Sequence, residues 1–295
     1  SYSNTLSGVK STASKGTLIL YYLMKTYNII LIVILASICI GCEPINQPTT
    51  AELGFSVSPT NKVVFSSGNL QYHPAKAQWR FAEHQYDYIG EDNIHISKDY
   101  KGWIDLFGWG TGNNPTLNTI DTRDYTTFTD WGINSISGYP QNTWRTLTAD
   151  EWEYLIYKRQ NAYAYMAVAQ VNGTNGLILL PDNWVAPKDI VIASGMNTYI
   201  NEENHYATYQ TFTATEWKKL EQNGAVFLPA AGYRWQDGVY GTETQVSVIQ
   251  EGGRYWSASS KTSEYAYLLD FNGSNLYVTT TYNVYGYSVR LVKDL

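Results

Sequence analysis

The sequence predicts an α+β fold built mainly from short strands, with two short helices and long irregular loops. Three observations predict it: Tyr, Trp and Gly are abundant, two segments carry the signature of a capped helix, and apolar residues alternate with polar ones near the C-terminus. The chain has 295 residues, of which 44% are hydrophobic and 16% charged. A chain of this composition can bury a core, which excludes a disordered protein or a coiled coil.

The N-terminal part has the pattern of a lipoprotein signal peptide over residues 24–41. Lys25 precedes an apolar run over 29–40, and the run ends at Gly41 and Cys42. The run is shorter than the roughly 20 apolar residues that a membrane-spanning helix needs. We therefore expect cleavage before Cys42 and lipidation of that residue.

This interpretation divides the rest of the N-terminal part. Residues 1–23 are expected to be an upstream leader, 42–62 a tether, and 63–295 the folded domain. The lipid predicts a place in the cell envelope, in the outer membrane, with exposure at the cell surface as one alternative. The membrane is thus an expected partner through the lipid.

The charge balance argues against a nucleic-acid partner. Acidic residues outnumber basic ones by 26 to 20, giving a formal net charge of −6. A duplex-binding protein usually carries a basic stripe, and none is evident.

The first part of the domain is expected to form hairpins and then a long insert. Apolar alternation predicts strands near 63–65, 70–72 and 79–81, separated by turn residues. Residues 99–144 are rich in Gly, Asn, Thr and Trp and have no regular period. Such a segment is either an ordered functional loop region or an embellishment packed by its own aromatic side chains.

Two helix-then-strand units repeat each other weakly. A Thr with a Glu three residues later forms a capping box at Thr148 and again at Thr213, which predicts helices over 148–159 and 213–222. Each helix is followed by an apolar segment ending in Pro, over 175–181 and 223–229. We interpret both segments as buried strands entered by Asn-Gly turns.

The C-terminal part is expected to be all strand. Strands are predicted over 255–257, 265–271, 276–281 and 287–292, divided by turn residues. The even-numbered apolar residues of 265–269 and 275–279 should face the core, which leaves the odd-numbered residues facing solvent.

Six motifs carry a resemblance to known families: WRTLT at 144–148, EWEYL at 151–155, LLPDNW at 179–184, FLPAAGYR at 227–234, YWSAS at 255–259 and GYSVRLV at 286–292. Residues 63–295 resemble the major paralogous (FISUMP-type) domain of envelope lipoproteins from Gram-negative gut anaerobes. They also resemble the variable proteins of diversity-generating retroelements. The resemblance implies a C-type lectin-like fold, with two helices flanking small twisted antiparallel sheets and a ligand-binding face on the C-terminal strands.

The resemblance also implies a recognition site between about 253 and 292 that the retroelement rewrites at adenines. The last 43 residues contain seven Tyr, six Ser, four Thr and three Asn, a composition that resembles an antibody paratope. An alternative interpretation is that Tyr simply fits the half-wet surface of any antiparallel sheet. The candidate ligand-binding residues are Lys261, Thr262, Glu264, Tyr265, Tyr267, Leu269, Asn272, Asn275, Tyr277, Thr279, Thr281, Tyr282, Asn283 and Tyr285.

The predicted function is therefore binding of a protein or glycan ligand, without catalysis, metal or cofactor. The four His residues are scattered and no metal-ligand motif appears. An undiversified adhesin of the same fold, binding glycan or an envelope protein, is the first alternative. The second is a glycan-processing hydrolase whose carboxylates come from Asp105, Asp124, Asp130 and Asp150.

Overall fold

The computed structural model describes residues 53–195, 210–236 and 244–295, all within the compact unit Pro48–Leu295. The predicted leader, the signal peptide and Cys42 lie outside the described residues, as does the first half of the predicted tether. No helix in the described ranges is both long and apolar enough to cross a membrane.

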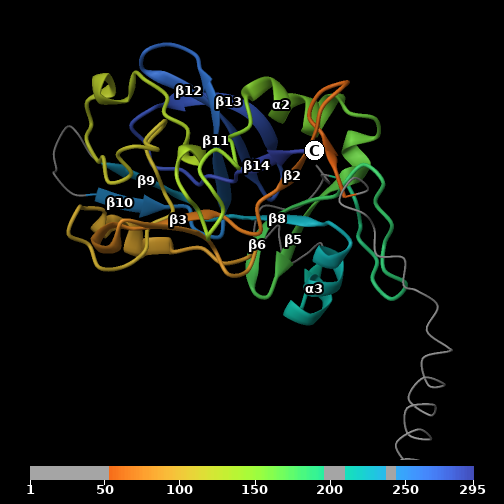
Figure 1. Ribbon diagram of the computed structural model, residues 1–295. Coiled ribbons are helices and arrows are strands. Elements are labelled where there is room, and N and C mark those ends of the chain that lie inside the picture. The colour runs from red at the N-terminus through yellow and green to blue at the C-terminus, as the bar shows by residue number, and fades with distance from the viewer. Residues whose placement is uncertain (1–52, 196–209, 237–243) are drawn as a thin grey trace, which may run out of the picture. The chain divides into compact units, whose positions relative to one another are not determined.

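The described residues form many short strands and few helices (Figure 1). The strands are β1 (Phe55–Ser56), β2 (Lys62–Phe65), β3 (Leu70–His73), β4 (Gln78–Phe81), β5 (Met166–Val171), β6 (Thr174–Leu179), β7 (Thr211–Phe212), β8 (Val226–Pro229), β9 (Tyr233–Gln236), β10 (Thr244–Ser247), β11 (Gly252–Ser260), β12 (Tyr265–Asn272), β13 (Leu276–Tyr282) and β14 (Val292–Asp294). The helices are α2 (Ala149–Glu153) and α3 (Ala214–Gln222), the π-turn η5 (Tyr154–Lys158), and the 3₁₀ turns η1 (Pro74–Lys76), η2 (Gly90–His95), η3 (Thr122–Tyr125), η4 (Trp131–Ile133) and η6 (Ala162–Tyr165).

These strands make small sheets, which confirms the predicted α+β class. The two main sheets are the four-stranded β7-β5-β6-β8 and the three-stranded β11-β12-β13. Figure 1 shows the second at the top of the molecule beside α2, and α3 beside the first at the bottom. The remaining sheets are β1-β2-β14, β3-β4 and β9-β10.

The predicted tether over 42–62 is wrong in its second half. Phe55 and Val57 are each 1% exposed and belong to the core, and β1 pairs with β2. Two buried apolar side chains within a polar stretch fix this segment on the domain, because burying them stabilises the fold by about 1.5–3 kcal/mol each. The folded domain therefore begins before residue 63.

Both predicted capping boxes are confirmed. The hydroxyl oxygen of Thr148 accepts a hydrogen bond from the backbone N–H of Glu151, and the Glu151 carboxylate accepts one from the backbone N–H of Thr148. Thr213 and Glu216 do the same at the start of α3. The first helix differs from expectation beyond Glu153, where the chain widens into the π-turn η5.

The two repeated segments lie side by side in one sheet. Strands β6 and β8 pair antiparallel, with Leu177 opposite Leu228. The Asn-Gly turn before β6 is not where the sequence predicts it. Asn172 and Gly173, both with positive φ, make the turn between β5 and β6, while Gly176 lies inside β6.

The predicted final strand over 287–292 is also different. Residues from Tyr287 onward make single bridges to two separate segments, Tyr287 with Phe107 and Ser288 with Tyr255, and regular pairing begins only at Val292 in β14. This stretch joins the insert to the sheet, and its carbonyl oxygens accept backbone hydrogen bonds from Trp256, Leu70 and Ser66 in turn.

Three buried clusters alternate with the two sheets. The middle core contains Leu177 and Leu228 from one sheet and Leu269 and Phe271 from the other, so it lies between them. The helix-side core packs α3 on the far face of β7-β5-β6-β8, through contacts such as Trp217 with Phe227 at 5.5 Å between ring centroids.

The third cluster, the insert-side core, covers the far face of β11-β12-β13. It joins Trp256 and Leu268 of that sheet to Phe107, Trp109 and Trp131 of the insert. The insert over 99–144 is thus packed by its own aromatic side chains, as the second of the two predicted possibilities requires.

Gly253 tests the packing of β11 against Phe271 of the middle core. A Cβ added there would lie 2.2 Å from the ring of Phe271, whereas at neighbouring Gly252 it would meet only the Phe271 carbonyl oxygen, at 3.2 Å. We expect Gly253→Ala to lower the free energy of unfolding in denaturant by about 1–3 kcal/mol, and Gly252→Ala by less, because overpacking forces side chains off their rotamers. Equal losses in the two variants would contradict the register of β11 against β12.

Candidate functional site

The candidate site lies on the sheet β11-β12-β13, in which β12 is the central strand. In the register of β12 with β13, Tyr265 is opposite Tyr282, Leu269 opposite Val278, and Asp270 opposite Tyr277. Residues directly opposite each other in an antiparallel pair project to the same face. Odd-numbered residues of β12 therefore share a face with even-numbered residues of β13.

This register corrects the predicted single face. Tyr265, Tyr267 and Leu269 project to the face that carries the middle core, whereas Tyr277 and Thr279 project to the opposite face. The rule of inward and outward residues holds within β13, where Leu276 is buried and Tyr277 and Thr279 are exposed. It fails within β12, because Leu268 and Leu269 are buried on opposite faces. It also fails between the strands, because the register pairs odd-numbered residues of β12 with even-numbered residues of β13.

Leu269 is the first of two candidate residues that the structure excludes from ligand contact. Its side chain is 0% exposed and packs in the middle core with Tyr255 and Phe271. The helical segment that covers this face is held there by the Tyr157 hydroxyl, which donates to the Leu276 carbonyl oxygen at 2.7 Å.

Asn283 is the second. It is 1% exposed, and its side-chain amide donates to the carbonyl oxygens of Thr122, Tyr125 and Ser263 at 3.3, 3.3 and 2.9 Å. The buried amide therefore ties the end of β13 to the insert. Asn283 therefore helps to hold the candidate site in place, but a ligand cannot reach its side chain.

The opposite face carries a polar row that begins with Arg254 on β11 and Asp270 on β12. Arg254 Nε lies 3.3 Å from Asp270 Oδ2, and the two side chains are 23% and 29% exposed. Tyr277 follows in the same row on β13 and is 53% exposed. Burial raises the pKa of Asp270, and Arg254 opposes that shift by stabilising the carboxylate.

Arg254 leads from this row to a group of tyrosines. Its guanidinium lies 4.5 Å from the centroid of the Tyr233 ring, and Tyr233 contacts Tyr285 at 6.0 Å between centroids. Tyr285 contacts Tyr282 at 6.0 Å, and Tyr282 contacts Tyr265 at 4.5 Å. Four rings thus form a continuous chain, which we call the tyrosine chain, across the end of the β12-β13 hairpin.

The tyrosine chain is partly exposed to solvent and packs on the buried ring of Tyr287. Tyr282 is 41% exposed and the other three rings are half-buried. Underneath, Tyr287 is 3% exposed, contacts both Tyr233 and Tyr285, and shares a hydrogen bond of 3.2 Å with the Thr281 hydroxyl. Burial raises the pKa of Tyr285, with further contributions from Tyr233 and Tyr282.

The remaining candidate residues lie at the two ends of the β12-β13 hairpin. These ends are roughly 25 Å apart, the length of an eight-residue strand. Lys261, Thr262 and Glu264 are exposed in the turn before β12, where the Thr262 hydroxyl accepts from two backbone N–H groups. Asn272 and Asn275 are exposed in the turn after it, where Asn272 accepts from the backbone of Ser274 and Asn275. Only the first turn adjoins the tyrosine chain.

Sequence reasoning missed three residues of this surface, namely Tyr233, Arg254 and Asp270. Tyr233 is distant in sequence, and its position follows from the bridge between Arg234 and Gly286. Arg254 and Asp270 share a face with Tyr277, a relation that follows from the apolar pairs Leu269–Val278 and Phe271–Leu276. Pairing the apolar residues of the two strands across the turn after Asn272 would have predicted this register from the sequence.

The carboxylates of Asp105 and Asp130 in the insert accept hydrogen bonds from protein groups around them. Asp105 is 0% exposed and accepts from the Asn93 amide and the Ile89 backbone N–H, both at 2.8 Å; its burial raises its pKa to about 6. Asp130 accepts from Gly132 and Thr146 backbone N–H groups at 2.9 Å each. Within the described ranges, no group of three or more His, Cys, Asp or Glu residues could hold a metal ion.

Comparison with protein families finds one match, between residues 196–292 and a family described as a domain of unknown function, DUF8237. The matched segment contains α3, β8, β9 and the whole β11-β12-β13 sheet. Searches of curated proteins and of solved structures find no significant match.

The contact between Tyr265 and Tyr282 is open to a direct test. A hydrogen bond with the Tyr282 hydroxyl raises the pKa of Tyr265 to about 12. We expect Tyr282→Phe to return that pKa towards the ordinary value of about 10, because the neutral phenol loses its partner. Residue-assigned NMR titration measures it, with Tyr277→Phe as control. An unchanged Tyr265 pKa in Tyr282→Phe would contradict the contact.

Proposed function

We propose that the protein is a ligand-binding envelope lipoprotein of C-type lectin-like fold. The fold proposal is supported by two short capped helices, one against each of the main sheets, and by a C-terminal antiparallel sheet at the molecular surface. The lipoprotein proposal is supported by the signal-peptide pattern that ends at Cys42.

The observation that carries the binding proposal is the tyrosine chain. Its four rings are held by contacts with one another and with buried Tyr287 beneath, so little conformational entropy remains to be lost when a ligand binds. Tyrosine offers both a large apolar contact area and a hydroxyl for hydrogen bonds. A rigid group of this kind is typical of a binding hot spot.

The polar row beside the chain extends the same surface. Arg254, Asp270, Tyr277 and Thr279 supply charge, hydroxyls and an exposed ring on one face of the sheet. We propose that the ligand, a protein or a glycan, covers the tyrosine chain and reaches this row. Tyr267 projects to the same face as Tyr265, but among the described residues no ring contact joins it to the tyrosine chain, so it is left out of the proposed site.

We further propose that a retroelement diversifies the exposed positions of this surface. The proposal rests on the composition of the C-terminal part and on the resemblance given above. The structure adds a restriction to it, because Leu269 and Asn283 are buried and any replacement of Asn283 would leave three carbonyl groups without their donor.

Sequencing this locus across a population tests the diversification. We expect amino-acid differences to concentrate at Lys261, Thr262, Glu264, Tyr265, Tyr277, Thr279, Thr281, Tyr282 and Tyr285. Asn283 should not vary, although its codon contains adenines, since variants there would fail to fold. Uniform sequences at all these positions would instead favour an undiversified adhesin of the same fold.

A second experiment tests binding itself. Screening the full chain on a defined glycan array and against purified envelope proteins should yield a ligand whose affinity falls by about 2 kcal/mol, roughly thirtyfold, in Tyr282→Ala and in Tyr285→Ala. Tyr163→Ala is the matched control, since Tyr163 is 62% exposed and lies outside the proposed surface. A ligand that binds all three variants equally well would place the binding site elsewhere.

A further inference from the structure

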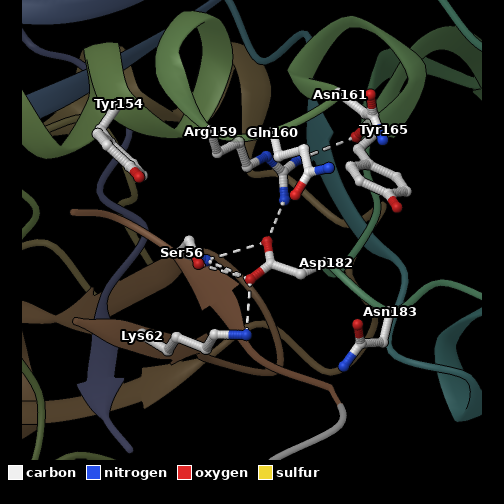
Figure 2. A pocket seen from close by; sticks show the side chains of 9 residues that line it. All are labelled: Ser56, Lys62, Tyr154, Arg159, Gln160, Asn161, Tyr165, Asp182 and Asn183. Carbon is white, nitrogen blue, oxygen red and sulfur yellow. Dashed lines mark hydrogen bonds and ion pairs between the residues drawn. The ribbon is translucent and has the colours of Figure 1, made fainter. Parts of the chain in front are cut away.

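A second, polar site lies between the N-terminal hairpin and the π-turn, and it shares no residue with the tyrosine chain. The cavity has a volume of about 410 Å³ and is lined by Ser56, Lys62, Tyr154, Arg159, Gln160, Asn161, Tyr165, Asp182 and Asn183. Cavities of this size hold small-molecule ligands. Figure 2 shows Asp182 between Lys62, Ser56 and Arg159, with the other side chains around them.

Asp182 organises the floor of this cavity. Its carboxylate accepts from the Ser56 hydroxyl at 2.6 Å, the Lys62 ammonium at 2.9 Å and Arg159 Nη1 at 3.2 Å. Hydrogen bonds and charge from Ser56 and Lys62 lower the pKa of Asp182 in spite of its burial, so the group is ionised at neutral pH.

Arg159 is held rigidly behind Asp182. Its side chain is 1% exposed and donates to the carbonyl oxygens of Leu180 and Tyr165 at 2.9 and 3.2 Å. The guanidinium also lies 5.2 Å from the Tyr165 ring centroid. Because Arg159 follows the π-turn η5 directly, the widened turn sets its position, and π-turns are frequent at functional sites.

The charges in the cavity do not cancel. Lys62 and Arg159 contribute two positive charges against one negative charge from Asp182, which leaves an excess of one positive charge. The Lys62 side chain is 42% exposed, and its ammonium has three donors, of which Asp182 takes one. An anionic group on a ligand can therefore bind Lys62 without displacing Asp182.

The cavity rim offers hydrogen-bonding groups with no partner of their own. Within the described ranges, the side-chain amides of Gln160, Asn161 and Asn183 make no hydrogen bond, and all three residues are exposed. Asn161 is held in a left-handed conformation, with φ of 57°, at the start of η6. Carboxamides both donate and accept, so together they suit a ligand with several hydroxyl groups.

We infer that this cavity binds a small hydroxyl-rich monoanion, of the chemical class of a sugar acid. The carboxylate of the ligand pairs with Lys62, and its hydroxyls bond to the amides of the rim. The rings of Tyr154 and Tyr165 flank the space where the ligand lies.

Calorimetric or NMR titration of the full chain with D-glucuronate, compared with D-glucose, tests the inference. The two probes have nearly the same shape and differ in one carboxylate. We expect glucuronate to bind saturably and about tenfold or more tightly than glucose, because a charge-assisted hydrogen bond is lost in the neutral sugar.

The variant Lys62→Gln should weaken glucuronate about tenfold or more and leave glucose unchanged. Lys158→Gln is the matched control: Lys158 pairs with Glu153 on the adjoining π-turn and does not line the cavity. Asn183→Ala should weaken both sugars, and thermal unfolding of each variant verifies that it is folded.

Two results would overturn the inference. One is the absence of saturable glucuronate binding to the folded wild-type chain. The other is binding that Lys62→Gln and Asn183→Ala leave unchanged, or that does not distinguish glucuronate from glucose. The tyrosine-chain variants Tyr282→Ala and Tyr285→Ala should not affect this titration, so failure here is separable from failure of the proposed surface.

Discussion

The strand β12 is buried on both of its faces, and the arrangement of the domain depends on this constraint. Leu269 and Phe271 pack in the middle core, while Ala266 and Leu268 pack in the insert-side core. Successive residues of one strand therefore belong to two different cores. Slipping the strand by one residue would exchange all of them at once, so its register is strongly specified. The rings at the end of its hairpin inherit that rigidity.

The two sites differ in what holds them in place. At the tyrosine chain, ring contacts and one buried amide, that of Asn283, fix the surface from below. In the polar cavity, Arg159 and Asp182 form a charged centre whose other partners are backbone carbonyl oxygens, Ser56 and Lys62. A buried ion pair is weak evidence for stability, because desolvation offsets much of the attraction. The arrangement of donors around the Asp182 carboxylate is therefore more informative about binding than about stability.

Local signals in the sequence predicted local structure well. The capping boxes at Thr148 and Thr213 are present, and the strands over 265–271 and 276–281 lie within one residue of β12 and β13. These features depend on hydrogen bonds and turns between residues close in the chain. Signals of this kind can be interpreted without knowledge of the tertiary fold.

What failed depended on contacts between distant residues. The burial of Leu269 requires a second core on a face that the sequence treats as solvent, and the burial of Asn283 requires the insert beside it. The burial of Phe55 likewise depends on the middle core, since Leu177 and Leu228 lie far away in the chain although its strand partner Val63 is close. Two Asn-Gly pairs, at Asn172 and at Asn175, are chemically alike, so the sequence does not distinguish the one that forms the turn from the one that lies within β6.

The strand β2 lies between β1 and β14, so the first and last strands of the described domain are separated by only one strand. Two inter-strand spacings amount to about 10 Å. A domain whose ends lie this close together can be spliced as one block into a surface loop of a carrier protein, without forcing the carrier's own backbone apart. The same proximity allows the described domain to be circularly permuted, with new ends opened in an exposed turn such as the one at Asn172.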